Sequence, residues 1–350
     1  MKRNILVIGI IFGLLGWSCS KVDNQSQPKG LKQSIEKNVA DINTAMSKIS
    51  ATKGYQILSL STNPAAKALD AGSFKDSITL SLIAGVYDYQ RDTIPMFHHF
   101  GYPFRLFKKT GTSDMMVVNL PQRLIFHPRY LHSFNMPDSV LKNDFKITAS
   151  DYHFYYNYWD SLDYKLNGSL TLNSTDLGSF AISTISNSYK DRSSSSQYTF
   201  PGGYAVSTSW QTGDTAKLAF TLLKDNGALL KETTLFLGSG FHRREKQYDL
   251  TIGNIEIKRG FGIDSIQVFM NGVLQKTAGA KITDSADSTG TICNKRDILL
   301  TFDDGTTAKL STLIGPPLAQ LKTLISSLHD MYFAENIVDY IALNIFYNSR

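Results

Sequence analysis

The chain has 350 residues, 42% of them hydrophobic, and a formal net charge of +6. This length supports a large core or two domains. The basic excess is small and no Lys/Arg-rich block occurs, which argues against a nucleic-acid partner. The only cysteines are Cys19 and Cys293. Their separation matches no metal-binding pattern, and we expect neither a metal nor a cofactor.

The first eighteen residues have the layout of a secretory signal. Lys2 and Arg3 give a positive start, an apolar run follows from Ile5 to Leu15, and small residues come next. The apolar run is about eleven residues long, whereas a membrane-spanning helix needs about twenty. We therefore predict a signal peptide at 1–18 rather than a permanent transmembrane helix.

The stretch "GLLGWSCS" places Cys19 directly after this segment. It resembles a bacterial lipoprotein signal of the Bacteroidota type. The resemblance implies that Cys19 becomes the acylated first residue of the mature chain, with membrane lipid as a partner. It also implies export and attachment to the outer membrane, on its periplasmic or cell-surface face. Residues 19–30 are predicted to form a flexible tether. The alternative is an ordinary signal peptide that happens to contain a cysteine.

A single β-rich domain is predicted from 31 to 350, and it begins with a helix at 31–50. Leu31, Ile35 and Val39 begin a pattern in which apolar residues recur every three or four positions, with polar residues between them. The apolar stripe of this helix should cover the sheet that follows.

From about residue 53 to 315 the apolar period changes toward two, which is typical of strands. No alternation with long helices occurs, which favours an antiparallel sheet. The serine-rich segment 190–202 is expected to be an exposed loop, as is at least the second half of 277–290. Asn-Gly and Asp-Gly pairs suit two-residue hairpins, because both central positions need a positive φ. The predicted turns are Lys109-Thr110-Gly111, Asn167-Gly168, Thr212-Gly213-Asp214, Asp225-Asn226-Gly227, Asn271-Gly272 and Asp304-Gly305.

A second helical pattern closes the chain. Pro316-Pro317 suits a first turn, and apolar residues then recur at helical spacing over 316–347. The predicted fold class is α+β, mostly antiparallel β. Its centre is a long β-meander sheet, curved or closed into a partial barrel, with an N-terminal helix and C-terminal helices packed on it.

Four histidines, His98, His99, His127 and His132, lie within 35 residues of one another. The nearest candidates for an enzyme site built from loops are His98, His99, His127 and Asp151. The usual metal-ligand spacings are missing, however, and packing of these rings beside neighbouring phenylalanines is the simpler interpretation. No catalytic motif occurs elsewhere, so we expect a protein that is not an enzyme.

The segment 151–166 is the densest aromatic stretch in the chain. In a strand, Tyr152 and Tyr156 share one face. Together with Trp159 they are candidate ligand-binding residues, because exposed rings could stack on sugar rings. The alternative is core packing and cross-strand pairing.

The sequence thus favours a non-enzymatic, lipid-anchored cell-envelope protein with a binding or scaffold role. One alternative is a carrier that holds an apolar ligand in a cavity between a curved sheet and its helices. Another is an outer-membrane lipoprotein that binds a glycan. The sequence leaves the oligomeric state open.

Overall fold

The computed structural model describes most of the predicted domain. Cys19, Trp159, Cys293 and the four candidate histidines lie outside the described residues. The described ranges are 30–58, 77–90, 107–122, 142–157, 161–187, 191–237, 244–260, 266–276, 279–285, 295–314 and 332–348. The helices are α1 (Leu31–Ser50), α2 (Lys53–Leu58), α3 (Leu80–Ile83) and α5 (Tyr332–Asn348), with a further helical turn at 310–314.

All described strands belong to one sheet. In chain order they are β1 (Ile78–Thr79), β2 (Gly85–Tyr89), β3 (Phe107–Gly111), β4 (Met116–Leu120), β5 (Phe145–Asn157), β6 (Ser161–Leu172), β7 (Thr175–Ser186), β8 (Arg192–Phe200), β9 (Tyr204–Thr212), β10 (Thr215–Lys224), β11 (Gly227–Leu237), β12 (Arg244–Ile252), β13 (Ile255–Gly260), β14 (Ile266–Met270), β15 (Val273–Leu274), β16 (Gly279–Ser285), β17 (Lys295–Thr301) and β18 (Thr307–Lys309).

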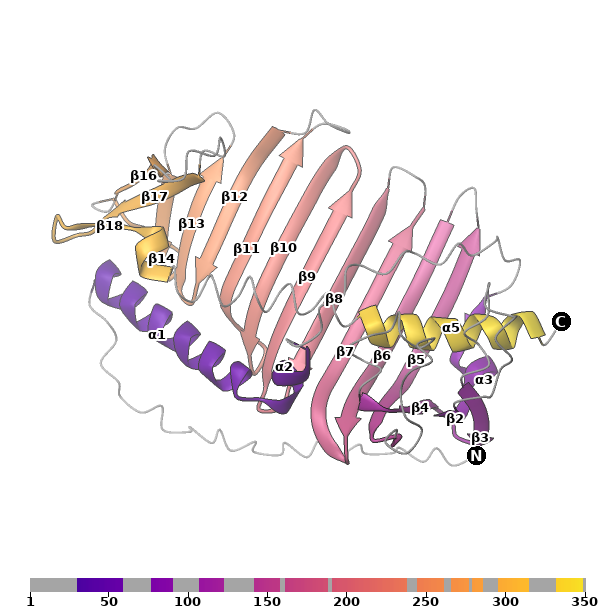
Figure 1. Cartoon of the computed structure of the whole chain (residues 1–350). Coiled ribbons are helices and arrows are strands. Elements are labelled where there is room, and N and C mark those ends of the chain that lie inside the picture. Colours follow the sequence, from indigo (N-terminus) through magenta and orange to yellow (C-terminus); the bar gives the residue numbers. More distant parts are fainter. Residues whose placement is uncertain are drawn as a thin grey trace, which may run out of the picture.

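The sheet is a long antiparallel meander, as predicted (Figure 1). From β5 to β14 each strand pairs with the next strand along the chain. β16, β17 and β18 continue the sheet beyond β14. At the other end β5 pairs with β1 and β4, and β2 lies between β3 and β4, where β2 and β4 form a parallel pair. The sheet stays open and does not close on itself.

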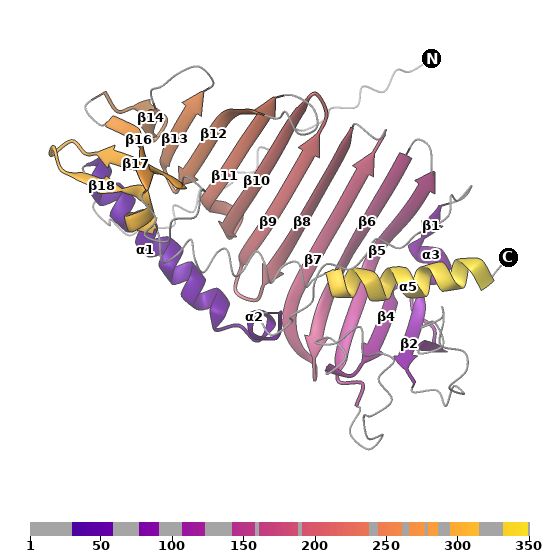
Figure 2. The ribbon, with the colours of Figure 1, turned by 45° about the horizontal axis from the view of Figure 1, so that its top comes forward.

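The two long helices cover opposite ends of the same sheet face (Figures 1 and 2). The α1 helix packs on β11 and β12, while α5 lies across β5 and β6 and contacts α3 and β1. The α1 helix has the predicted bounds, and its buried side chains include Leu31, Ile35 and Ile42. The apolar stripe therefore covers the sheet as the sequence indicates. Among the described helices, none is both long and apolar enough to cross a membrane.

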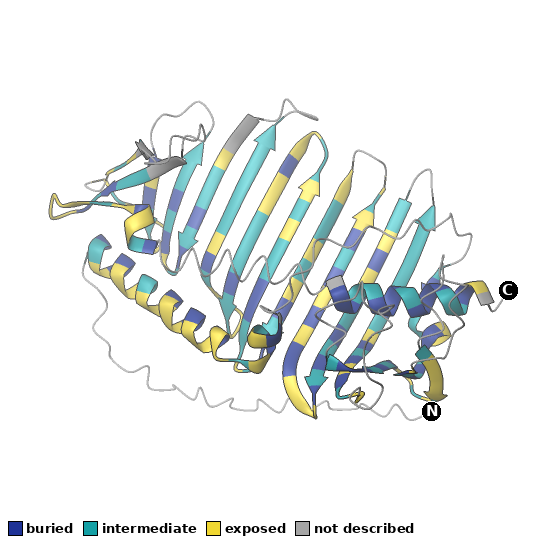
Figure 3. Cartoon of the chain, viewed as in Figure 1, coloured by how far each residue is buried: buried dark blue, intermediate teal, exposed yellow. Residues whose placement is uncertain are grey.

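Figure 3 shows the resulting burial pattern, in which dark positions alternate along many strands. In β4, for example, Met116, Val118 and Leu120 are buried while the residues between them are half-buried. Alternate side chains of a strand point to opposite faces. The helix-covered face therefore carries the core, and we call the opposite face of the sheet the outer face.

Several local predictions are wrong. Segment 190–202 is not a loop, because it contains β8. In 277–290, the β16 strand occupies Gly279–Ser285, and 286–290 lie outside the described residues. The predicted turn at Asn167-Gly168 lies inside β6, where a Cβ on Gly168 would be 2.6 Å from the carbonyl oxygen of Thr148. Glycine is required there by a close neighbour rather than by a turn. The predicted strand region also contains the short helices α2 and α3.

Candidate ligand-binding surface

Tyr152 is a core residue and cannot present its ring to a ligand. It is 2% exposed and lies on β5 beneath α5. Tyr156 is half-buried and packs against the same core, and Trp159 lies outside the described residues. For Tyr152, the stacking hypothesis from the sequence is therefore corrected in favour of core packing.

Tyr152 belongs to a buried polar cluster that joins α5 to the sheet. Its hydroxyl donates to Oδ1 of Asp339 at 3.0 Å, and the hydroxyl of Tyr164 on β6 donates to the same oxygen at 3.1 Å. Burial, and then the charge of Asp339, raises the pKa of both tyrosines well above the ordinary value. Both hydroxyls therefore stay protonated and remain donors.

Two carboxyl groups of α5 face this cluster. Burial raises the pKa of Asp339 to about 7. Burial and then the nearby charge of Asp339 raise the pKa of Glu335, one helical turn earlier, to about 8. The groups that surround these carboxyls, Tyr152 and Tyr164, are hydrogen-bond donors without positive charge. The cluster therefore resists ionisation and acts as a structural contact. No group of three His, Cys, Asp or Glu side chains suited to a metal occurs in the described part of the chain.

The layer between α5 and the sheet is filled by side chains. The ring of Phe145 meets that of Phe333 edge to face, with 6.4 Å between centroids, and the rings of Tyr152 and Tyr164 meet in the same way. Such aromatic pairs prefer this geometry. This packing offers no support for an apolar cargo beneath α5.

The outer face of the sheet has a different character, because its middle is polar. The strand register places Lys165, Ser183, Ser195, Ser209 and Ala219 side by side in one cross-strand row from β6 to β10. Directly opposed residues of antiparallel strands share a face. Four of these five side chains are short, so the row is low compared with the longer side chains beside it.

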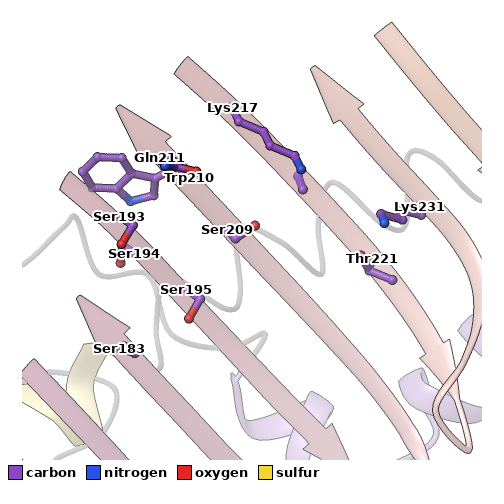
Figure 4. Close-up of a pocket in the computed structure, with 11 residues that line it drawn as sticks. Ser183, Ser193, Ser194, Ser195, Ser209, Trp210, Gln211, Lys217, Thr221 and Lys231 are labelled. Carbon is purple, nitrogen blue, oxygen red and sulfur yellow. The ribbon is translucent and has the colours of Figure 1, made fainter. Parts of the chain in front are cut away.

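Two adjoining hollows follow this row, and Figure 4 shows the residues that line the larger one. One has a volume of about 400 Å³ and the other about 320 Å³. They share Ser183, Ser195 and Ser209, so together they form one shallow trough across β6 to β11. We call this trough, with its lining residues, the serine trough. Besides the shared serines, its lining includes Lys165, Asn167, Gln197, Gln211, Lys217, Thr221 and Lys231.

The charged residues that line the serine trough are all lysines. The amine of Lys165 is paired with the carboxylate of Asp151 at 2.6 Å. Lys217 and Lys231 are exposed, and neither has an ion-pair partner within the described residues. The trough therefore carries an uncompensated positive charge.

Hydroxyl groups on the two faces of the same strands differ in their hydrogen bonding. On the helix-covered face, Ser196 hydrogen-bonds Thr208 at 2.8 Å, and Thr184 hydrogen-bonds Ser194 at 2.9 Å. On the outer face, the side chains of the shared serines make no hydrogen bond to other described residues. Their donors and acceptors are therefore available to a ligand or to water.

The fold and this surface are the basis for comparison with known proteins. Family models, curated proteins and solved structures show no match to the chain. The serine trough must therefore be interpreted from its own chemistry.

The sequence interpretation missed this surface. One signal was available, because Ser193, Ser195, Ser207 and Ser209 alternate with residues of the other face. Such alternation is compatible with a strand that is polar on one side. The pairing of these strands with those that carry Lys217 could not be read from the sequence.

Proposed function

We propose that this protein is a lipid-anchored cell-envelope protein that binds a ligand on the outer face of its sheet. The anchor is the acylated Cys19. The single observation that carries this half of the proposal is the position of Cys19, directly after a charged, apolar and small-residue segment. An acylated anchor with more than one chain would hold the protein stably at a membrane.

The chain length after Cys19 is compatible with this arrangement. Gly30, where the described domain begins, is eleven positions after Cys19. A segment of that length reaches about 40 Å when fully extended. A flexible chain of the same length has a root-mean-square span of about 20 Å. Either value leaves room for the domain beside a membrane surface.

The binding half of the proposal is supported by the open sheet. Both long helices cover the same face, so neither hides the outer face (Figures 1 and 2). The serine trough is polar and shallow, which favours a hydroxylated ligand such as a glycan over an apolar cargo. The polar trough therefore supports the glycan-binding alternative. The carrier alternative receives no support, because aromatic side chains pack in the layer under α5.

The anchor is tested by metabolic labelling with an alkyne-bearing fatty acid, followed by fractionation of the cells. Cys19→Ser should abolish labelling and move the protein to the soluble fraction. Cys293→Ser is the matched control, since Cys293 is the only other cysteine, and it should leave labelling unchanged. Membrane association of Cys19→Ser equal to that of the wild type would overturn the anchor.

A further inference from the structure

We infer that the serine trough binds an extended segment of an acidic polysaccharide. The inference rests on the binding half of the proposed function and names the class of ligand. It is independent of the lipid anchor, because the trough lies wholly within the described domain.

The shape of the trough indicates a polymeric ligand. Its lining residues come from six neighbouring strands, β6 to β11. Strands are spaced about 4.8 Å apart, so five steps correspond to about 24 Å. The trough is shallow and crosses the strands. Figure 4 shows the part of it that is lined by residues from Ser183 to Lys231. This shape suits several units of a polymer and not a compact metabolite, which a deep pocket would enclose.

The floor of the trough offers hydrogen-bonding groups to a ligand. Ser195 and Ser209 are exposed and directly opposite each other on β8 and β9. A hydroxyl can donate one hydrogen bond and accept two, which matches the hydroxyls of a sugar. Gln197 and Gln211, also exposed, add amide groups along the edges of the trough.

Two lysines give the trough a positive charge. Lys231 lies opposite Thr221, four positions along β10 from Lys217. At about 3.4 Å per residue along the strand, the two lysines stand about 14 Å apart. Both lack an acidic partner among the described residues, and no acid lines the trough. Ala219 lies midway between Lys217 and Thr221 on β10, so the two lysines flank the row of serines from opposite sides. A polymer in the trough that carries carboxylate or sulfate groups would lie between the two amines and neutralise them, whereas a neutral glycan would leave them unpaired.

The test measures the affinity of the full-length lipidated protein, purified in a non-ionic detergent, for polygalacturonate. Dextran serves as the neutral polymer. We expect binding to polygalacturonate that weakens as salt rises, since exposed charges are screened, and at least tenfold weaker binding to dextran. Lys217→Gln/Lys231→Gln should lower the affinity for polygalacturonate about tenfold. Ser195→Trp, which fills the floor, should lower it as strongly.

The matched control is Lys37→Gln/Lys48→Gln, which removes the same charge from exposed positions on α1. It should change the affinity less than twofold. An equal loss in this control would show attraction to net charge alone and would overturn the site. Equal affinity for dextran, equal affinity for duplex DNA, or no binding of the wild type would overturn the ligand class. None of these results would alter the fatty-acid labelling, so failure here is distinguishable from failure of the anchor.

Discussion

Tyr152 on β5 donates its hydroxyl to the carboxyl oxygen of Asp339 on α5, across 3.0 Å and 187 positions of sequence. The same oxygen accepts the hydroxyl of Tyr164 from the neighbouring strand. A buried polar group is stabilising only while it is hydrogen-bonded. The C-terminal helix is thus fixed on the sheet by a contact in which each partner depends on the other.

Replacing Asp339 with alanine should weaken the docking of α5. Both tyrosine hydroxyls would lose their acceptor while remaining buried, and each such loss costs about 1–3 kcal/mol. We expect the free energy of unfolding in urea to fall by about 2–4 kcal/mol. Asp41→Ala, at an exposed position on α1, should change it by less than about 0.5 kcal/mol.

A compensating variant separates loss of a contact from general disruption. Tyr152→Phe/Tyr164→Phe/Asp339→Leu removes all three polar groups at once. Replacing both partners of a buried contact by apolar groups can be nearly neutral. This triple variant should recover most of the stability lost in Asp339→Ala. A triple variant less stable than Asp339→Ala would contradict this role for the cluster.

The acid pair on α5 should make stability depend on pH. The pKa of Asp339 is raised to about 7 and that of Glu335 to about 8, in both cases first by burial. The folded state therefore binds more protons than the unfolded state, and stability falls as pH rises from about 4 to about 8. The two groups titrate as a coupled pair. Urea unfolding at pH 5, 7 and 9 measures this trend.

The matched variant for the pH series is Glu335→Gln/Asp339→Asn, which keeps the size of both side chains and removes their titration. As pH rises, the free energy of unfolding of the wild type should fall relative to that of this variant. A difference that is constant from pH 5 to pH 9 would show that the pair does not control this dependence.

Gly54 should be needed where α2 meets β7. A Cβ at this position would collide with the carbonyl oxygen of Leu177 and lie 3.2 Å from the hydroxyl of Tyr198. Alanine favours helices over glycine by about 1 kcal/mol. Gly54→Ala should nevertheless lower the free energy of unfolding by about 1–3 kcal/mol, because the tight contact has no room for a methyl group. Thermal unfolding followed by circular dichroism shows whether the variant is less or more stable than the wild type.

Gly213→Ala is the control for this variant. A Cβ at Gly213 would have its nearest neighbour at 3.7 Å, an ordinary contact distance. Its unfolding midpoint should stay close to that of the wild type. A Gly54→Ala protein at least as stable as the wild type would contradict the close approach of α2 to β7.

Sequence periodicity predicted the elements whose apolar residues face one side. The α1 helix was predicted with its bounds, because its buried residues follow a regular three-to-four spacing. Gly168 misled the prediction, because its proximity to Phe180 on the neighbouring strand outweighs the turn preference of Asn-Gly. Turn rules describe local chemistry, whereas this glycine is required by a tertiary contact.

The β8 strand shows why the binding surface was not predicted. Its four consecutive serines lack the apolar alternation by which a strand is usually recognised. In the middle of the sheet β8 pairs on both sides, with β7 and β9, so its backbone is satisfied without a fully apolar face. The two unpaired lysines come from β10 and β11, and only the register brings them to the same trough.

Hydroxyl-radical footprinting of the lipidated protein, with and without polygalacturonate, tests most directly whether the outer face binds the ligand. We expect the polymer to protect side chains in 193–197, 207–211 and 217–221, while the exposed residues of α1 and α5 react as before. Protection confined to the helices, or an unchanged pattern under conditions in which the polymer is bound, would contradict this expectation.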